Sequence, residues 1–265
     1  MDEQIANMEE RKLYAACPLC DSRQLDDLCV GDCSKHALYR KELSPHIHWK
    51  QCGACKHVFT NGYFTEAACQ LLFGGTHATQ TVGHDLERQR HFSARMVDKV
   101  LPFISEGTWL DVGFGNGSLL FTAQEYGFVP IGIDLRAENV RVMSSLGIAS
   151  YCVDVTRLEL AGPCDVISMA DVLEHMPFPR EGLKHAHRLL AAHGILFLSM
   201  PNSESMLWTA MNQNNANPFW GEIEHYHNFS RTRLYSLLEE AGFTPMRYGV
   251  SERYRACMEV IARKQ

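Results

Sequence analysis

Residues 109–118 read WLDVGFGNGS, an apolar run that leads into a glycine loop and then into the apolar stretch 119–121. This order predicts a short buried strand, a tight loop and the start of a helix. Alternate glycines let the backbone turn sharply and approach a ligand closely. The helix behind the loop offers free N–H groups at its N-terminus. The stretch therefore predicts a cradle for a nucleotide-type cofactor.

The spacing of the glycines narrows the choice of cofactor. A dinucleotide loop reads G-x-G-x-x-G and directs its helix N-terminus at a pyrophosphate, whereas this loop reads G-x-G-x-G and is preceded by Asp111. A carboxylate there would repel a pyrophosphate but could hold a cationic amine. The next expected strand, 129–134, ends in Asp134, whose carboxylate suits a ribose diol. The order strand, loop, helix, strand, acid favours a ligand site over a glycine-rich turn without a ligand.

This pattern resembles the class I S-adenosylmethionine (SAM) methyltransferases, whose first motif is a D-x-G-x-G-x-G strand and loop followed by an acid at the end of the second strand. The resemblance covers residues 92–264 and implies a SAM-dependent methyltransferase. Asp111 would then line the methionine moiety, and Asp134 would take the ribose hydroxyls. The other cofactor-binding residues that the resemblance implies are the loop glycines Gly113, Gly115 and Gly117, then Leu135, Asp154 and Val155 at the adenine, and Met169 and Ala170 beside the ribose and sulfonium.

Strands and helices alternate after the glycine loop. The expected helices are 137–146, 180–192 with Gly194 as C-cap, and 230–241. The expected strands are 149–154, 164–170, 195–200 and two more runs near the C-terminus. Alternation of this kind implies a mostly parallel sheet that is covered on both faces. We therefore predict an α/β, Rossmann-like fold with a seven-stranded, mostly parallel sheet and helices on both faces, plus a small N-terminal zinc ribbon.

Three consecutive parts are expected along the chain. They are a zinc-ribbon module at 1–62, a helical lid or linker at 63–104 and a SAM-dependent methyltransferase domain at 105–265. Within the lid we expect a loop at 73–77 and a helix at 84–103, whose apolar residues share one face.

The composition limits the class of protein. The chain has 265 residues with 46% hydrophobic and 21% charged residues, which is typical of a globular protein. No apolar run approaches the ~18 residues needed to cross a bilayer, and the N-terminus does not resemble a signal peptide. The net charge of −6 gives no overall attraction to nucleic acid. Ten cysteines without a secretion signal indicate a reducing compartment, so we expect a cytoplasmic protein with no membrane partner.

Two C-x-x-C knuckles in the N-terminal part indicate a metal site. The knuckles are formed by Cys17 with Cys20 and by Cys52 with Cys55. Each can turn two thiolates toward one point, and two knuckles complete a tetrahedral zinc site. Four thiolates close the coordination shell, so we expect a structural Zn²⁺ that compensates for the small core of the module. Cys29 and Cys33 are rival ligands with a less usual C-x-x-x-C spacing.

Two histidine-containing clusters are candidates for the catalytic machinery. They are 171–177, which reads DVLEHMP, and 222–227, which reads EIEHYH. Methyl transfer requires alignment of the acceptor and removal of its proton, for which histidine is the usual base near neutral pH. Glu224 and His225 resemble the E-H pair of zinc-binding deoxysugar C-methyltransferases, which also carry a cysteine zinc module and a histidine at the position of His175. In this interpretation Glu224 orients His225, which acts as the base.

A second resemblance implies a different chemistry. Metal-assisted O-methyltransferases of the ubiquinone-pathway and small-RNA end-methylating kinds carry an E-x-x-E-H motif and a later histidine. Asp171, Glu174 and His175 with His227 could copy that set and hold Mg²⁺ or Mn²⁺, which would lower the pKa of an acceptor hydroxyl. An L-E-H-x-P run also occurs widely in class I methyltransferases without a metal, where the histidine shapes the pocket. The interpretations of base, pocket residue and metal ligand therefore remain open.

The segment that follows the fifth strand is expected to form a wall of the acceptor pocket. Its aromatic residues are Trp208, Phe219, Trp220 and Tyr226. An aromatic pocket with polar groups suits a small molecule, and the scarcity of basic residues disfavours stacking on nucleic acid. We predict methyl transfer to a small metabolite, a sugar or natural-product intermediate. The alternatives are an RNA or protein methyltransferase that uses the ribbon for docking, and a catalytically silent binding module.

Overall fold

The computed structural model describes residues 10–73, 78–254 and 256–265. The predicted loop at 73–77 lies mostly outside these residues. The chain forms two compact units. The first unit comprises Met1–Gly75, Glu174–Pro179 and Pro201–Leu234. The second unit comprises Thr76–Leu173, Arg180–Met200 and Tyr235–Gln265. Because two later segments join the N-terminal part, the units are not consecutive stretches of sequence.

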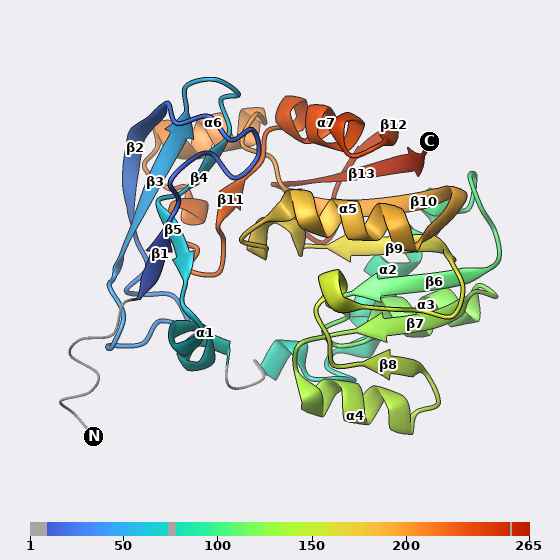
Figure 1. Ribbon diagram of the computed structural model, residues 1–265. Coiled ribbons are helices and arrows are strands. Elements are labelled where there is room, and N and C mark those ends of the chain that lie inside the picture. The colour runs from blue at the N-terminus through green and yellow to red at the C-terminus, as the bar shows by residue number, and fades with distance from the viewer. Residues whose placement is uncertain (1–9, 74–77, 255) are drawn as a thin grey trace. The chain divides into compact units, whose positions relative to one another are not determined.

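The second unit is built on a seven-stranded sheet in the order β12-β13-β10-β9-β6-β7-β8 (Figure 1). The strands are β6 (Thr108–Val112), β7 (Val129–Ile133), β8 (Ala149–Tyr151), β9 (Cys164–Ala170), β10 (Leu190–Pro201), β12 (Phe243–Val250) and β13 (Cys257–Lys264). The five strands from β10 to β8 run parallel to their neighbours, and β12 is antiparallel to β13. The predicted Rossmann-like sheet is therefore confirmed, as a mixed sheet of seven strands.

Helices lie on both faces of this sheet, with α5 in front of it and α2 and α3 behind it in Figure 1. The helices are α2 (Leu86–Val100), α3 (Ser118–Glu125), α4 (Ala137–Ser145), α5 (Pro179–Leu189) and α7 (Arg231–Glu240). The apolar face of α2, with Met96, Val97 and Val100, shares a buried core with Trp109 of β6 and Phe128. This packing fixes β6 and the start of α3, and hence the glycine loop that joins them.

Two predicted boundaries differ from the structure. The helix expected to extend to residue 192 ends at Leu189, and β10 begins at Leu190. Gly194 is therefore not a helix C-cap but part of an irregularity in β10, where the register to β9 shifts between Leu190 and Ile195. The strand expected at 149–154 ends at Tyr151, because Asp154 caps a short 3-10 helix at Val155–Arg157 instead.

The first unit contains two small antiparallel sheets. One pairs β1 (Arg11–Leu13) with β5 (Gly62–Phe64). The other has the order β11-β4-β3-β2, with β2 (Leu25–Asp32), β3 (His46–Cys52), β4 (Val58–Thr60) and β11 (His227–Asn228). Strand β4 follows directly after the second cysteine knuckle at 52–55. Its partner β11 comes from far along the sequence, because His227 pairs with Phe59 and Asn228 with Val58.

Three helical segments complete the first unit. They are α1 (Glu66–Phe73), α6 (Met206–Gln213) and a 3-10 helix at Pro218–Gly221. The core of this unit joins Ile47 and Trp49 of β3 to Ile223 and Tyr226 of the late segment. Within the described residues, the structure contains no helix that is both long and apolar enough to cross a membrane.

Candidate functional site

The glycine loop after β6 has the backbone of a ligand cradle. Gly113, Gly115 and Gly117 have φ angles of 69°, 55° and 80°, which side chains of L-residues rarely adopt. A Cβ at Gly117 would lie 2.1 Å from the Cε of Met143, so a side chain cannot fit there. At Gly115 the nearest atom to such a Cβ is the Gly113 carbonyl oxygen at 3.9 Å, which leaves that side of the loop open.

Asp111 lies at the end of β6, just before the loop, and its side chain is buried. The residue is 4% exposed, and Ser168 Oγ donates a hydrogen bond to its Oδ1 at 2.6 Å. Ser168 Oγ in turn accepts from Trp109 Nε1 at 2.8 Å. Burial raises the pKa of Asp111 from 3.8 to about 7, against the opposing effects of Ser168 and the Arg253 charge. A cationic ligand group would favour the ionised form of this buried carboxylate.

Asp134 lies after β7, where a ribose acid was predicted, but its carboxylate already has protein partners. It accepts from Gly115 N at 3.1 Å, from Arg136 N at 2.9 Å and from Arg136 Nε at 2.7 Å. Arg136 Nη2 forms an ion pair at 2.6 Å with Oδ2, the same oxygen that accepts from Gly115 N. A ribose diol would therefore have to share this carboxylate with Arg136 or displace it.

Residues of the predicted lid contact the glycine loop. Asn139 Nδ2 donates to the carbonyl oxygens of both Gln80, at 2.9 Å, and Gly115, at 3.1 Å. Gly83 N donates to Asn116 O at 3.1 Å. Residues 78–84 thus cover part of the loop, within the second unit.

The predicted adenine-contacting residues differ in exposure. Leu135 is 72% exposed, whereas Val155 is 2% exposed and lies in the core. Asp154 Oδ1 accepts from Thr156 N at 2.8 Å and from Thr156 Oγ1 at 2.6 Å, which makes it a helix cap. Leu135 is thus presented as an apolar surface, and the other Asp154 oxygen remains for a donor.

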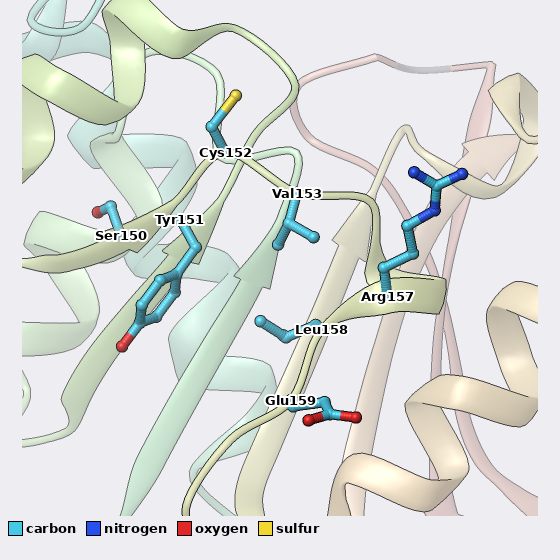
Figure 2. Close-up of a pocket in the computed structure, with 7 residues that line it drawn as sticks. All are labelled: Ser150, Tyr151, Cys152, Val153, Arg157, Leu158 and Glu159. Carbon is cyan, nitrogen blue, oxygen red and sulfur yellow. The ribbon is translucent and has the colours of Figure 1, made fainter.

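A hollow of about 450 Å³ lies beside β8 and the turn that follows it. Figure 2 shows Val153 and Leu158 between Tyr151 on one side and Arg157 on the other. The residues that line it are Ser150, Tyr151, Cys152, Val153, Arg157, Leu158 and Glu159. None of the predicted cofactor residues is among them, so this hollow flanks the predicted adenine end and is distinct from the glycine cradle.

The carboxyl end of β9 carries a second acid in an ion pair. Met169 is fully buried and Ala170 is half-buried. Asp171, with φ of 55°, follows them and pairs with Arg253. Ser199 Oγ donates to the Oδ1 of Asp171 at 3.0 Å. Asp171 was predicted as a possible metal ligand, but both of its oxygens bind protein groups here.

The four knuckle cysteines come together in the first unit. Their sulfur atoms all lie within 4.8 Å of one another. Cys17 Sγ lies 3.7 Å from Cys55 Sγ, and Cys20 Sγ lies 3.6 Å from Cys52 Sγ. A tetrahedral site with Zn–S bonds of about 2.3 Å has S···S edges of about 3.8 Å, so the donor set fits zinc. The rival Cys33 instead points its Sγ at the Pro45 carbonyl oxygen, 3.3 Å away.

Glu174, His175 and His225 form a second cluster of possible ligands in the first unit. One ligand atom from each lies within 4.8 Å of the others, and the two imidazole rings meet at 85° with centroids 4.7 Å apart. His175 Nδ1 donates to the Glu224 carbonyl oxygen at 3.0 Å. His225 is 7% exposed, and its Nδ1 has no hydrogen-bond partner within the described residues. Burial is the main cause that lowers the pKa of His225, and the charge of the neighbouring His175 lowers it further. The ring is therefore neutral.

His227 does not join this cluster. Its Nε2 lies 2.9 Å from the Met176 carbonyl oxygen, which can only accept, so Nε2 carries the proton. Its Nδ1 must then accept from His57 Nε2 at 3.0 Å. Burial lowers the pKa of His227 to about 3, which keeps the ring neutral. Both nitrogens of this predicted catalytic or metal-binding residue are thus occupied by the protein.

The carboxylate of Glu224 lies with His36 and Glu222. One ligand atom from each of the three lies within 4.8 Å of the others, and His36 Nε2 pairs with Glu222 Oε1 at 2.5 Å. Hydrogen bonding to Glu222 raises the pKa of His36. Across the described part of the chain, no hydrogen bond joins the Glu224 carboxylate to His225, which Glu224 was predicted to orient.

A row of aromatic rings leads to His225. Trp208 stacks on Phe219 with centroids 5.2 Å apart, and Phe219 stacks on His225 at 6.2 Å. Trp220 meets Trp208 at 5.4 Å and Trp49 of the ribbon at 5.6 Å. Three of the four predicted aromatic residues, Trp208, Phe219 and Trp220, therefore lie together within the first unit, beside Trp49 of β3.

Strands β2 and β3 are in close contact with these aromatic residues. Trp49 Nε1 donates to the Trp220 carbonyl oxygen at 2.9 Å. A Cβ at Gly31 of β2 would lie 1.7 Å from the same oxygen, so only glycine allows the two backbones to approach so closely. Tyr226, which was expected in the wall, is 3% exposed and packs on Phe64 in the core.

Four residues in these arrangements were not singled out from the sequence. They are His36, His57, Arg136 and Arg253. Arg136 lies two residues after Asp134, so the ion pair between them could have been predicted from the sequence. The other three meet partners more than eighty residues away, and no spacing rule links them.

Comparison with known proteins agrees with this geometry. Residues 85–247 match the family described as methyltransferase domain, which is more than half of the chain. The chain therefore belongs to the methyltransferase-domain family, and the predicted class of enzyme is confirmed.

The curated relatives match shorter stretches of the chain than the family does. A ubiquinone biosynthesis O-methyltransferase of Caulobacter vibrioides is 30% identical over 103 residues, which are 36% of this chain and 41% of that protein. One of Coxiella burnetii is 32% identical over 100 residues, 35% of this chain and 43% of that protein. The chain thus matches about two fifths of the length of these relatives.

Two solved structures show the same fold. A 1,6-didemethyltoxoflavin-N1-methyltransferase of Burkholderia thailandensis, solved with its substrate and S-adenosylhomocysteine (SAH), has a TM-score of 0.58 and 20% identity, over 79% of this chain and 96% of that one. A magnesium protoporphyrin IX methyltransferase of Synechocystis, solved with SAH, has a TM-score of 0.53 and 19% identity, over 67% and 84%.

Proposed function

We propose that this chain transfers a methyl group from SAM to a small-molecule acceptor and holds a structural zinc ion in its N-terminal module. The observation that carries the proposal is the open glycine cradle beside Asp111, a buried carboxylate whose ionised form a bound cation would stabilise. The relatives and solved structures named above are methyltransferases of small molecules by name, which supports the same class of acceptor.

The cofactor would be held by residues of the second unit. The loop glycines allow its methionine end to approach the backbone, and Asp111 would bind its ammonium group. Asp134 would meet the ribose, while the exposed Leu135 and the free oxygen of Asp154 would contact the adenine. When bound, SAM supplies a methyl group on a sulfonium, which is already a good leaving group. Alignment and proton removal remain for the protein to provide.

His225 is our candidate for the base. A base must carry a lone pair, and burial keeps this imidazole neutral. Its Nδ1 has no partner among the described residues, so it has an unused position for a proton. Phe219 stacks on its ring and is itself backed by the buried Trp208. The half-buried Phe219 and Trp220 could contact a flat or sugar-like acceptor. We assign the acceptor to the sugars or natural-product intermediates, and His175 and Glu224 to the surroundings of the base.

A metal-assisted O-methyltransferase is the second candidate, and the cluster of Glu174, His175 and His225 favours it. Carboxylate and imidazole together suit Mn²⁺ or Mg²⁺ at a site that polarises a hydroxyl. The originally expected set fits less well, because Asp171 pairs with Arg253 and His227 uses both nitrogens. The reduced set of three ligands is therefore the one to test.

For this second candidate, a mild chelator that spares the cysteine-bound zinc should abolish methyl transfer, and Mn²⁺ should restore it. Zinc content is measured in the same samples, so that loss of the ribbon metal is recognised. Full activity after chelation, at a constant zinc content, would exclude the metal-assisted reaction and leave the base mechanism.

Binding of SAH, measured by calorimetry on the zinc-loaded protein, tests the proposed function directly. Gly113→Arg should abolish binding of SAH, because the new side chain would fill the cradle. The backbone φ of 69° at this position also disfavours a side chain, and a Cβ there would lie 3.0 Å from Val172. Gly162→Arg is the matched control, since Gly162 is exposed and nothing lies within 4 Å of its Cβ position. Absence of SAH binding to the unmodified protein would refute the proposal.

The same titration has a pH signature. The pKa of Asp111, raised from 3.8 to about 7, keeps the carboxyl protonated in acid and ionised above neutrality. Since the ammonium group needs the ionised form, SAH affinity should rise about tenfold per pH unit up to about pH 7 and then level off. Asp111→Asn should bind SAH about 100-fold more weakly above pH 7 and lose this slope. Equal slopes for the two proteins would remove Asp111 from the cofactor site.

A further inference from the structure

Arg253 is fixed at the carboxyl end of the parallel strands of the second unit. It lies in the connection between β12 and β13, and its Nη2 pairs with Asp171 Oδ2. Asp171 directly follows β9 and is held by Ser199 of β10, through its backbone N–H to the Ser199 carbonyl oxygen at 2.8 Å and through the Ser199 hydroxyl at 3.0 Å. An arginine from the β12–β13 hairpin thus reaches the carboxyl edge of the sheet, where Asp111 lies near the end of β6.

The charge of Arg253 acts on both acids at this edge. It pairs with Asp171 and also favours the ionised form of Asp111. Strands β6 and β9 are neighbours in the sheet, with Asp111 opposite Ser168 in the register. The guanidinium therefore pairs with Asp171 and acts at longer range on Asp111, which is only 4% exposed.

The guanidinium has donors left over. An arginine carries five N–H groups on three nitrogens. Within the described residues, its only hydrogen bond joins Nη2 to Asp171. The Tyr254 ring lies 4.9 Å from its central carbon, and the side chain retains 27% of its exposure. The Nε and Nη1 groups can therefore bind an acceptor outside the protein.

We propose that Arg253 binds the carboxylate of the amino-acid end of the cofactor, while Asp111 takes the ammonium group. This inference rests on the proposed SAM function. The amino-acid end of SAM is a zwitterion, and an acid alone would satisfy only its positive half. A planar guanidinium matches a carboxylate in geometry as well as charge. Arg253 thereby selects adenosyl compounds that retain the carboxylate.

The test compares two probes by calorimetry, SAH and S-adenosyl-3-thiopropylamine, which is SAH without its carboxylate. The unmodified protein should prefer SAH by about 30-fold, the contribution of a charge-assisted contact. Arg253→Met should lose about 30-fold in SAH affinity and bind both probes equally. Arg247→Met is the matched control, because Arg247 is exposed on the same hairpin, and it should keep the preference.

Two further variants separate binding from a structural role. Asp171→Asn removes the negative charge that pairs with Arg253 and should keep the preference for SAH. If Arg253 acted only through its ion pair with Asp171, this variant should lose the preference for SAH. Arg253→Lys keeps the positive charge but loses the planar guanidinium, so it should reduce the preference for SAH. This variant replaces Arg253→Met in the test if Arg253→Met does not fold. An undiminished preference in the Arg253 variants, with SAH bound by the unmodified protein, overturns this inference alone. Failure of the unmodified protein to bind SAH overturns the proposed function together with it.

Discussion

Cys52→Ser is expected to release the bound zinc and unfold the first unit. Cys52 is fully buried and its sulfur lies 3.6 Å from that of Cys20 in the proposed tetrad. Structural zinc contributes an apparent ~10–16 kcal/mol in small modules, which exceeds or matches the total stability of a typical domain, ~5–15 kcal/mol. Zinc content per chain, measured by mass spectrometry of the metal, should fall from one ion to nearly none, and β2, β3 and β4 should lose protection from hydrogen exchange.

Cys29→Ser is the matched control for this loss. Cys29 is half-buried, lies in the same module and is the rival ligand by sequence, but it is not part of the four-sulfur cluster. It should retain one zinc ion and normal exchange protection. Full zinc content in Cys52→Ser, or its loss in Cys29→Ser, would show that the tetrad is assigned incorrectly.

His225→Ala should reduce methyl transfer by about 10²- to 10⁴-fold, the usual contribution of a general base. SAH affinity should not change, because every residue proposed to hold the cofactor lies in the second unit. Transfer is followed as SAH release in the presence of a panel of sugar and phenolic acceptors. His48→Ala is the control, since His48 is an exposed histidine of the same unit, and it should retain activity.

Either of two results would contradict this role of His225. Retained turnover with unchanged SAH affinity would exclude it as the base. Loss of turnover together with loss of a bound Mn²⁺ would instead make His225 a metal ligand, together with Glu174 and His175. In both cases the cofactor site would remain as proposed, because its test is a binding measurement.

The parts of the molecule that were predictable from the sequence depend on local spacing. Glycines two residues apart after a strand require one loop geometry, and two cysteines three residues apart require one knuckle geometry. The mostly parallel, Rossmann-like sheet followed from the alternation of strands and helices. These signals lie within a few residues, where the backbone itself determines the geometry.

The remaining features arise from partners far apart in the chain. The ion pair of Asp171 with Arg253 and the pairing of His57 with His227 each join distant elements, so single residues gave no sign of them. His227 illustrates the consequence, because its residue type suggested chemistry while its two partners make it a structural residue. Gly194 is a local case, where strand pairing from Leu190 overrides the helix C-cap that glycine suggests.

The pairing of β11 with β4 has a consequence for the order of folding during synthesis. Both knuckles, at 17–20 and 52–55, are made early and can capture zinc as soon as they emerge. The sheet they belong to is completed only when His227 and Asn228 arrive, more than 160 residues later. Contacts between such distant residues form slowly, and unpaired strand edges invite aggregation. The sheet β11-β4-β3-β2 is therefore expected to remain incomplete until most of the chain has been made. A fragment that ends before β11 should be poorly soluble even when it is loaded with the proposed zinc.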